Sequence, residues 1–378
     1  MKHIYPLLII IVLLFTITGC SSDSDNQHSP ILETSFYKGM DLSFQMEYEP
    51  YNIPFKDENG QPINLLNYVQ SQGNNLVRLR LWHTPENGQN TLDKVKLYAQ
   101  KIKANNMDFL LDIHYSDFWA DPAHQTPPAE WQNLSQIELE QAIYNYTRHV
   151  VSELENQGTT PKIIQIGNET DSGFLWNYGK VWGEFQDNWP NYINLVQAAI
   201  DGVKSIDTQD HIKIMIHYSN PVTANGYFQK LASNNLEYDY MALSYYPRHH
   251  TRDPQLLNQK LNYLSDTFNK PIMLVEVAYP FTFDWNDNKN NKVGSDSQII
   301  PEYPATPEGQ KAFMQMLINM MKNLNNDNGL GVCYWAPDFV AFDGNENTST
   351  GGSSWENQCM FNFNYEALPI FEAYSEID

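Results

Sequence analysis

Cysteine is scarce in this chain, which has three among its 378 residues. Cys20 belongs to an N-terminal leader described below, so Cys333 and Cys359 remain for the main body of the chain. A chain of this length can bury a substantial core without a disulfide framework. We therefore expect Cys333, inside an apolar segment, to be a buried reduced thiol; a Cys333–Cys359 disulfide is the alternative. No spacing of cysteine and histidine predicts a zinc site.

Basic residues are also few. The chain has 23 lysines and arginines against 45 aspartates and glutamates, which gives a formal net charge of -22. Repulsion by such a surface disfavours nucleic acids and polyanionic substrates as partners. The charge itself is adequately explained by solubility, so it excludes partners and identifies none.

The apolar run from Leu7 to Phe15 is shorter than a bilayer-spanning helix requires, so it predicts a signal peptide over residues 1–19. The sequence Ile17-Thr18-Gly19-Cys20 resembles a bacterial lipobox, which implies that Cys20 becomes a lipidated N-terminus. A secreted protein cleaved nearby is the alternative. Residues 20–34 are largely polar, as in a flexible tether. We therefore expect a lipid-anchored, monomeric protein at the bacterial outer membrane or cell surface.

Short apolar segments alternate with amphipathic ones from residue 35 to the C-terminus, which predicts one (β/α)8 TIM barrel, an α/β fold, over residues 35–378. The expected strands are 36–41, 76–82, 109–114, 163–167, 212–217, 240–244, 272–276 and 331–335. Expected helices include 92–104, 138–155, 192–204, 255–268 and 307–324. A doubly wound sheet is the alternative, but Lys38 to Ser43 provides no glycine-rich phosphate turn.

Two of these strands lead into glutamates. Residues 162–166 are followed by a loop that contains Asn168 and Glu169, and residues 271–275 are followed directly by Glu276. In a barrel both carboxyls would lie at the same mouth, as acid–base hydrolysis of a glycosidic bond requires. We expect Glu169 to be the proton donor and Glu276 the nucleophile, held charged by Tyr245 and Arg80, with the carboxyls about 5–5.5 Å apart. Strand-end ion pairs are the alternative interpretation of each glutamate alone.

Other strand ends are polar or aromatic, and polar groups at these positions usually belong to the site of a barrel. Asp112 paired with Arg78 is read as a structural pair. Tryptophans 82, 119, 176, 285 and 335 follow strand ends and could stack on sugar rings, whereas tryptophans 131, 182 and 189 are expected to pack. The expected substrate-binding residues are Asp41, Arg80, Trp82, His114, Asp117, Trp119, Asn168, Tyr245 and Trp335.

An ordered set of motifs resembles the glycoside hydrolase family 53 endo-β-1,4-galactanases. The motifs are residues 73–82, 114–122, 167–169, 243–247, 275–280 and 352–358. The resemblance, from about Phe36 to the C-terminus, implies a retaining barrel enzyme with Glu169 as acid/base and Glu276 as nucleophile. It implies arabinogalactan endo-β-1,4-galactanase activity on the galactan side chains of pectin.

No cofactor is expected for the chemistry. The family's bacterial members can carry calcium between two loops, and here Asp284, Asp287 and Asp343 are the candidate ligands of a structural calcium ion, with a solvated acidic loop as the alternative. The functional alternatives are another retaining barrel glycosidase, of mannanase or xylanase type, and a surface glycan-binding lipoprotein without activity.

Overall fold

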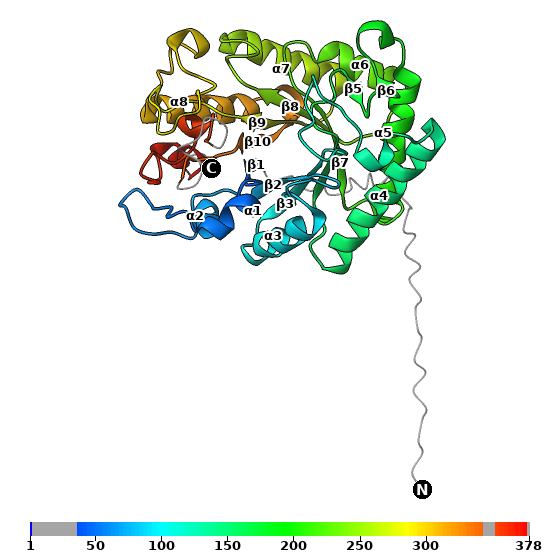
Figure 1. Cartoon of the computed structure of the whole chain (residues 1–378), viewed down its shortest axis with the longest axis horizontal. Coiled ribbons are helices and arrows are strands. Elements are labelled where there is room, and N and C mark those ends of the chain that lie inside the picture. The colour runs from blue at the N-terminus through cyan, green and yellow to red at the C-terminus, as the bar shows by residue number, and fades with distance from the viewer. Residues whose placement is uncertain (2–35, 343–351, 376–378) are drawn as a thin grey trace. The chain divides into compact units, whose positions relative to one another are not determined.

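A closed barrel of eight parallel strands forms the centre of the computed structural model, which describes Met1 and residues 36–342 and 352–375. The barrel strands follow one another around the barrel in chain order, with helices outside (Figure 1). The (β/α)8 barrel expected from the sequence is confirmed. The barrel strands are β1 (Tyr37–Asp41), β2 (Leu76–Leu81), β3 (Asp108–Ile113), β4 (Ile163–Ile166), β7 (Lys213–Tyr218), β8 (Tyr240–Tyr245), β9 (Ile272–Val277) and β10 (Gly329–Trp335).

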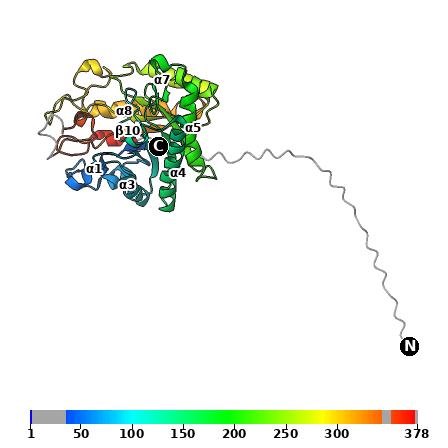
Figure 2. The same ribbon diagram turned by 45° about the vertical axis from the view of Figure 1, so that its right-hand side comes forward.

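Two of the longer helices begin at N-cap residues that the sequence offers. Ser135 and Glu138 form a reciprocal capping box, and the side chain of Thr306 accepts a hydrogen bond from the backbone of Gly309, as expected of an N-cap. Helices α4 and α5 lie side by side outside the barrel (Figure 2). The long helices are α3 (Leu92–Ala104), α4 (Gln136–Asn156), α5 (Trp189–Lys204), α7 (Pro254–Phe268) and α8 (Pro307–Lys322).

A two-stranded hairpin and several short helices occur in addition to the barrel strands and the long helices. The loop after β4 contains a two-stranded hairpin, β5 (Gly173–Phe174) and β6 (Gly179–Lys180), which the strand count of the sequence missed. Glycine is required at 173, because a Cβ there would lie 2.3 Å from a backbone oxygen of the partner strand. The short helices are α1 (Gln45–Tyr48), α2 (Leu65–Ser71), α6 (Asn225–Ser233) and α9 (Glu372–Ser375).

Two layers of apolar side chains surround the strands. The barrel interior is filled at its lower end by residues such as Leu76, Leu110 and Met273, while a larger cluster lies between strands and helices. Apolar layers of this kind leave the upper, carboxyl ends of the strands for polar groups. Cys333 and Cys359 are both buried free thiols, so the expected reduced state of Cys333 is confirmed.

Apart from Met1, the predicted signal peptide (1–19) lies outside the described residues, as do the tether (20–34) with Cys20, and Asp343. Among the residues that the structure describes, no helix has the length and apolar character needed to cross a membrane.

Candidate active site

A tight turn after β4 presents Glu169 at the barrel mouth. Gly167 has φ +74°, and a Cβ at this position would lie 2.7 Å from the methyl group of Thr170, so glycine is required here. Glu169 itself has φ +46°, an uncommon conformation for a residue with a side chain. The buried run of Ile163 to Ile166 therefore passes directly into a constrained turn that fixes the direction of the Glu169 carboxyl.

An extra residue in β9 directs Glu276 to the same mouth. Leu243 of β8 pairs with Leu274, but the next residue, Ser244, pairs with Glu276, so β9 contains a β-bulge around Val275. Val275 packs in the barrel interior, and Glu276, 6% exposed, lines the groove above it. Without the bulge, the alternation of a regular strand would place these neighbouring side chains on opposite faces.

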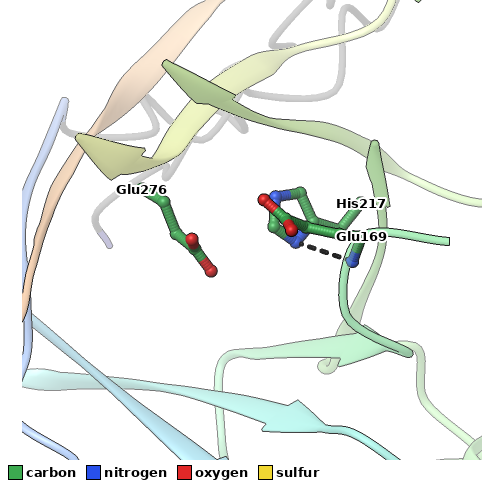
Figure 3. Close-up of side chains that lie close together, drawn as sticks. All are labelled: Glu169, His217 and Glu276. Atoms are coloured by element: carbon green, nitrogen blue, oxygen red, sulfur yellow. Dashed lines mark hydrogen bonds between the residues drawn. The ribbon is translucent and has the colours of Figure 1, made fainter. Parts of the chain in front are cut away.

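The two glutamates face each other across the mouth (Figure 3). Ligand-type atoms of Glu169, Glu276 and His217 all lie within 4.8 Å of one another. Carboxyl oxygens this close are compatible with the separation of about 5–5.5 Å between the two carboxyl groups of retaining glycosidases. A metal ion does not suit the cluster, because Nε2 of His217 is engaged with Ser244 and Nδ1 with Asn168 and the backbone N–H of Glu169.

Glu276 is held by two donors. The guanidinium of Arg78 lies 3.0 Å from one carboxylate oxygen, and the hydroxyl of Tyr246 donates a 2.9 Å hydrogen bond to the other. Burial and the negative charges of Asp112 and Asp41 raise the pKa of Glu276, and the positive charge of Arg78 and the Tyr246 hydroxyl oppose that rise. Arg78 and Tyr246 are therefore the groups that favour the carboxylate form of Glu276.

Glu169 has the opposite balance. Burial raises its pKa well above the usual value, and the negative charges of Glu276 and Asp171 raise it further. One hydrogen bond opposes this shift, a 2.7 Å contact in which the Ser244 hydroxyl donates to the carboxylate. Because no cation pairs with Glu169 among the described residues, it is the member of the pair that retains its proton to higher pH.

Arg78 connects Glu276 to the barrel interior. Its buried guanidinium forms 2.8 Å ion pairs with both Asp41 and Asp112, so the expected Arg78–Asp112 pair is confirmed. Burial would raise the pKa of Asp112, but Arg78 and His114 lower it below the usual value. Arg78 is thus both a structural residue and a direct neighbour of Glu276, which the sequence interpretation missed.

A groove of about 920 Å³ runs over both glutamates. Seven of the nine expected substrate-binding residues line it, together with residues that were not expected, among them Phe44, Glu47, Tyr246, His249 and Trp355. Aromatic faces beside polar groups are what a sugar-binding cleft offers. The expected residues in its lining are Asp41, Arg80, Trp82, His114, Trp119, Asn168 and Trp335.

Arg80 does not reach Glu276, so its expected role there is wrong. Its guanidinium lies 4.4 Å from the ring centre of Phe44 and 4.1 Å from that of Trp119, and it pairs with Glu47 at 2.8 Å. Glu47 and Phe44 follow β1 in and beside the short helix α1. Stacking between these two rings holds the Arg80 guanidinium in the lining of the groove.

Tyr245 was also misassigned. Its hydroxyl donates to the backbone of Thr251, and its ring stacks on Phe313 of α8, outside the barrel. The neighbouring Tyr246 makes the contact with Glu276 instead. The alternation of β8 contained this signal, because Ala242 points into the barrel interior and every second residue after it shares that face.

Asp117 lies beside the groove and not in its lining, which corrects the expectation of a substrate contact. Its carboxylate accepts hydrogen bonds from the backbones of Thr84 and Ala129 and so joins two loops. Trp176 lines a separate hollow with Trp131, and Trp285 is exposed outside the lining of the groove. Trp182, which was expected to pack, is 68% exposed.

The loops after β9 and β10 offer oxygen atoms of the kind that calcium prefers. Oε2 of Glu356 and Oδ1 of Asn291 are buried without a hydrogen-bond partner among the described residues, and burial raises the pKa of Glu356 to about 7. Asp287, one of the expected ligands, accepts hydrogen bonds from the backbones of Lys289 and Ser353, while Asp284 is exposed. Glu356 and Asn291 thus join Asp284 and Asp287 as candidate calcium ligands among the described residues.

Comparison with known proteins identifies the family. The profile described as glycosyl hydrolase family 53 matches residues 37–374. An uncharacterized protein of Niallia circulans is 36% identical over 90% of this chain and 94% of its own length. The arabinogalactan endo-β-1,4-galactanase of Cellvibrio japonicus is 33% identical over 89% of this chain and 90% of its own length. The solved family 53 catalytic domain of Ignisphaera aggregans superposes with a TM-score of 0.83 at 33% identity, covering 91% of this chain and 97% of that one. The chain therefore belongs to glycosyl hydrolase family 53.

Proposed function

We propose that this protein is a retaining endo-β-1,4-galactanase that cleaves the galactan side chains of pectin. The observation that carries the proposal is the opposed pair Glu169 and Glu276, whose carboxylate oxygens approach within 4.8 Å at the groove of a family 53 barrel. The name printed for the Cellvibrio japonicus relative supports galactan as the substrate.

In the first step, the Glu276 carboxylate attacks the anomeric carbon while Glu169 donates its proton to the leaving oxygen. A covalent glycosyl–enzyme results, and the chain fragment beyond the cleaved bond departs. In the second step, Glu169 accepts a proton from water, which attacks the same carbon and releases Glu276. Arg78 and Tyr246 keep Glu276 ionised before attack and accommodate its returning charge afterwards.

The remaining lining residues position the sugar. Asn168 is fixed from both sides, since its amide nitrogen donates to Ala120 and its oxygen accepts from Arg78, and it lies beside Glu169 in the groove. Trp119 and Trp335 provide flat apolar faces against which the C–H face of a galactose ring can pack, and the buried Trp82 contacts the edge of Trp119.

The experiment that tests this proposal is to size the products released from lupin galactan, with β-mannan and xylan as parallel substrates. An endo-galactanase gives a ladder of galacto-oligosaccharides from galactan alone. Cleavage of mannan or xylan in place of galactan would support the alternative of another retaining glycosidase, and binding of galactan without any cleavage would support a glycan-binding lipoprotein.

We further propose that Cys20 carries a lipid that anchors the enzyme at the outer membrane or cell surface, where polymeric galactan is accessible. The lipobox-like sequence before Cys20 supports this proposal. Release of the Cys20→Ser variant into the medium, with the wild-type chain retained in the membrane fraction, is the expected result. Equal partitioning of the two proteins would exclude the anchor.

A structural calcium ion near Asp287, Asn291 and Glu356 is the last part of the proposal; when bound, the ion would stabilise the loops after β9 and β10. The unpartnered oxygens of Asn291 and Glu356 support it. Chelation by EDTA should lower the melting temperature, and calcium should restore it. A melting temperature that EDTA leaves unchanged would contradict the site.

A further inference from the structure

A second hollow of about 700 Å³ lies beside the groove, on the loops after β3 and β4. The turn of the β5–β6 hairpin forms one wall, and the segment leading into α5 forms another. Its main aromatic and amide residues are Trp131, Gln132, Trp176, Tyr178, Phe185 and Asn191. Neither the chemistry of Glu169 nor that of Glu276 uses any of them.

The lining of the hollow has the composition of a sugar site. The indole of Trp176 is held in place because its N–H donates to the backbone of Ser172, and Lys180 lies 4.4 Å from the ring centre. Tyr178, at the same hairpin turn, is 39% exposed. Fixed aromatic faces that remain partly accessible, next to side-chain amides, match the alternating C–H faces and hydroxyls of a pyranose.

Charge selects among glycans. Glu184 and Asp187 are the carboxylates that line the hollow. An acidic polysaccharide such as a polyuronate would be repelled by these two carboxylates, because its sugars are negatively charged as well. A neutral glycan, rich in hydroxyls, is the occupant that this lining favours.

A continuous surface joins the hollow to the groove. The depression between them shares Phe118, Trp119 and Asp121 with the groove, and it shares Pro127 and Gln132 with the hollow. Phe118, 61% exposed, presents an apolar aromatic face along this surface. A single extended glycan chain can therefore run from the two glutamates to Trp176.

The position of the hollow indicates which part of the chain it meets. Trp176 and Tyr178 stand on the same loop as Glu169, a few residues further along. Glu169, as proton donor, lies on the side of the departing oxygen, so the loop that carries it flanks the part of the substrate that leaves. The hollow is thus on the leaving-group side of the cleaved bond.

We propose that this hollow is a distal binding site for the leaving-group, reducing-end portion of the neutral galactan chain. The proposal rests on the proposed function and adds to it a reason for preferring long polymers: sugars bound at Trp176 hold the chain in register across Glu169 and Glu276.

The test compares wild type with Trp176→Ala and Tyr178→Ala, using Trp182→Ala as the matched control because Trp182 is an exposed tryptophan of the same loop that does not line the hollow. The readout is the ratio of kcat/KM on lupin galactan to kcat/KM on galactotetraose. Loss of one stacked ring should lower this ratio by about 3- to 10-fold in the two hollow variants and leave it unchanged in Trp182→Ala.

A second measurement tests whether the hollow lies on the leaving-group side of the cleaved bond. With long galacto-oligosaccharides labelled at the reducing end, the labelled product should become shorter in Trp176→Ala, because the leaving portion loses its anchor. A longer labelled product would place the hollow on the other side and overturn the proposal. An unchanged ratio in both hollow variants, or an equal fall of the ratio in Trp182→Ala, would also overturn this proposal. If the wild-type protein fails to cleave galactan, the proposed function and this inference are both wrong. Binding of polygalacturonate in place of galactan would contradict the choice of a neutral glycan.

Discussion

Removing the Tyr246 hydroxyl should shift the acid limb of the pH–activity profile to higher pH. In Tyr246→Phe, Glu276 loses the 2.9 Å hydrogen bond to one of its oxygens and keeps Arg78 on the other. A hydrogen bond to a charged group contributes about 1.5–3 kcal/mol, which corresponds to roughly tenfold or more in the ionisation equilibrium of Glu276.

The sign follows from which form the hydroxyl stabilises. Tyr246 donates to the carboxylate, so it lowers the pKa of Glu276 against the rise caused by burial. Without the hydroxyl that pKa increases, and at acidic pH a smaller fraction of the enzyme carries an ionised nucleophile. The acid limb of kcat/KM therefore moves upward, while the alkaline limb, which reports the proton on Glu169, stays in place.

The assay is reducing-sugar release from galactan across the full pH range. Tyr245→Phe is the matched control, because it removes the same atom one residue earlier, where the hydroxyl bonds to the backbone of Thr251 away from the groove. An acid limb that is unchanged in Tyr246→Phe, or equally displaced in Tyr245→Phe, would refute the assignment of Tyr246 as the residue that keeps Glu276 ionised.

Three further predictions concern the groups around the cleaved bond. Glu169→Gln should lower kcat on galactan by about 10²- to 10⁴-fold and lower it far less on an aryl galactoside with an acidic leaving group, since such a group departs without a proton; equal losses in initial rate would exclude the acid role. Glu276→Gln should abolish release of oligosaccharides while galactan still retards the protein in affinity electrophoresis, and unchanged release would remove the nucleophile assignment. Arg78→Met should cost about 3–5 kcal/mol in the free energy of unfolding measured with urea, because it leaves Asp41 and Asp112 buried and unpaired; a loss below about 1 kcal/mol would contradict the proposed electrostatic network.

The sequence predicted the barrel because its signals are local. Each strand is a short apolar run, and inward residues such as Arg78 and Asp112 occur at every second position, so the alternation of one strand is enough to place them. Thr306 and Pro307 likewise mark the start of α8 without reference to the rest of the chain. The elements and the strand-end glutamates were therefore accessible from the sequence.

The errors arose where tertiary structure decides. Arg80 could have faced Glu276 by alternation alone, but Phe44 and Glu47, brought from the segment after β1, capture it. The contacts of Arg80 with Phe44 and Glu47 depend on packing between segments that are distant in the sequence, which no local sequence pattern predicts. Tyr245 is different: counting two residues on from Ala242 and Ser244 would have selected Tyr246, so that error was avoidable.

The bulge in β9 makes the alignment of a whole strand depend on one acidic side chain. If β9 relaxed to an uninterrupted ladder, Glu276 would rotate toward the outer helices and lose Arg78, so its own charge opposes that slip. A leucine at 276 has no such preference for the mouth, and it would free the strand to straighten and shift Val277 and the loop beyond it. Inactive forms made for trapping substrate should accordingly carry an isosteric amide at this position, since an aliphatic replacement would alter the shape of the groove along with its chemistry.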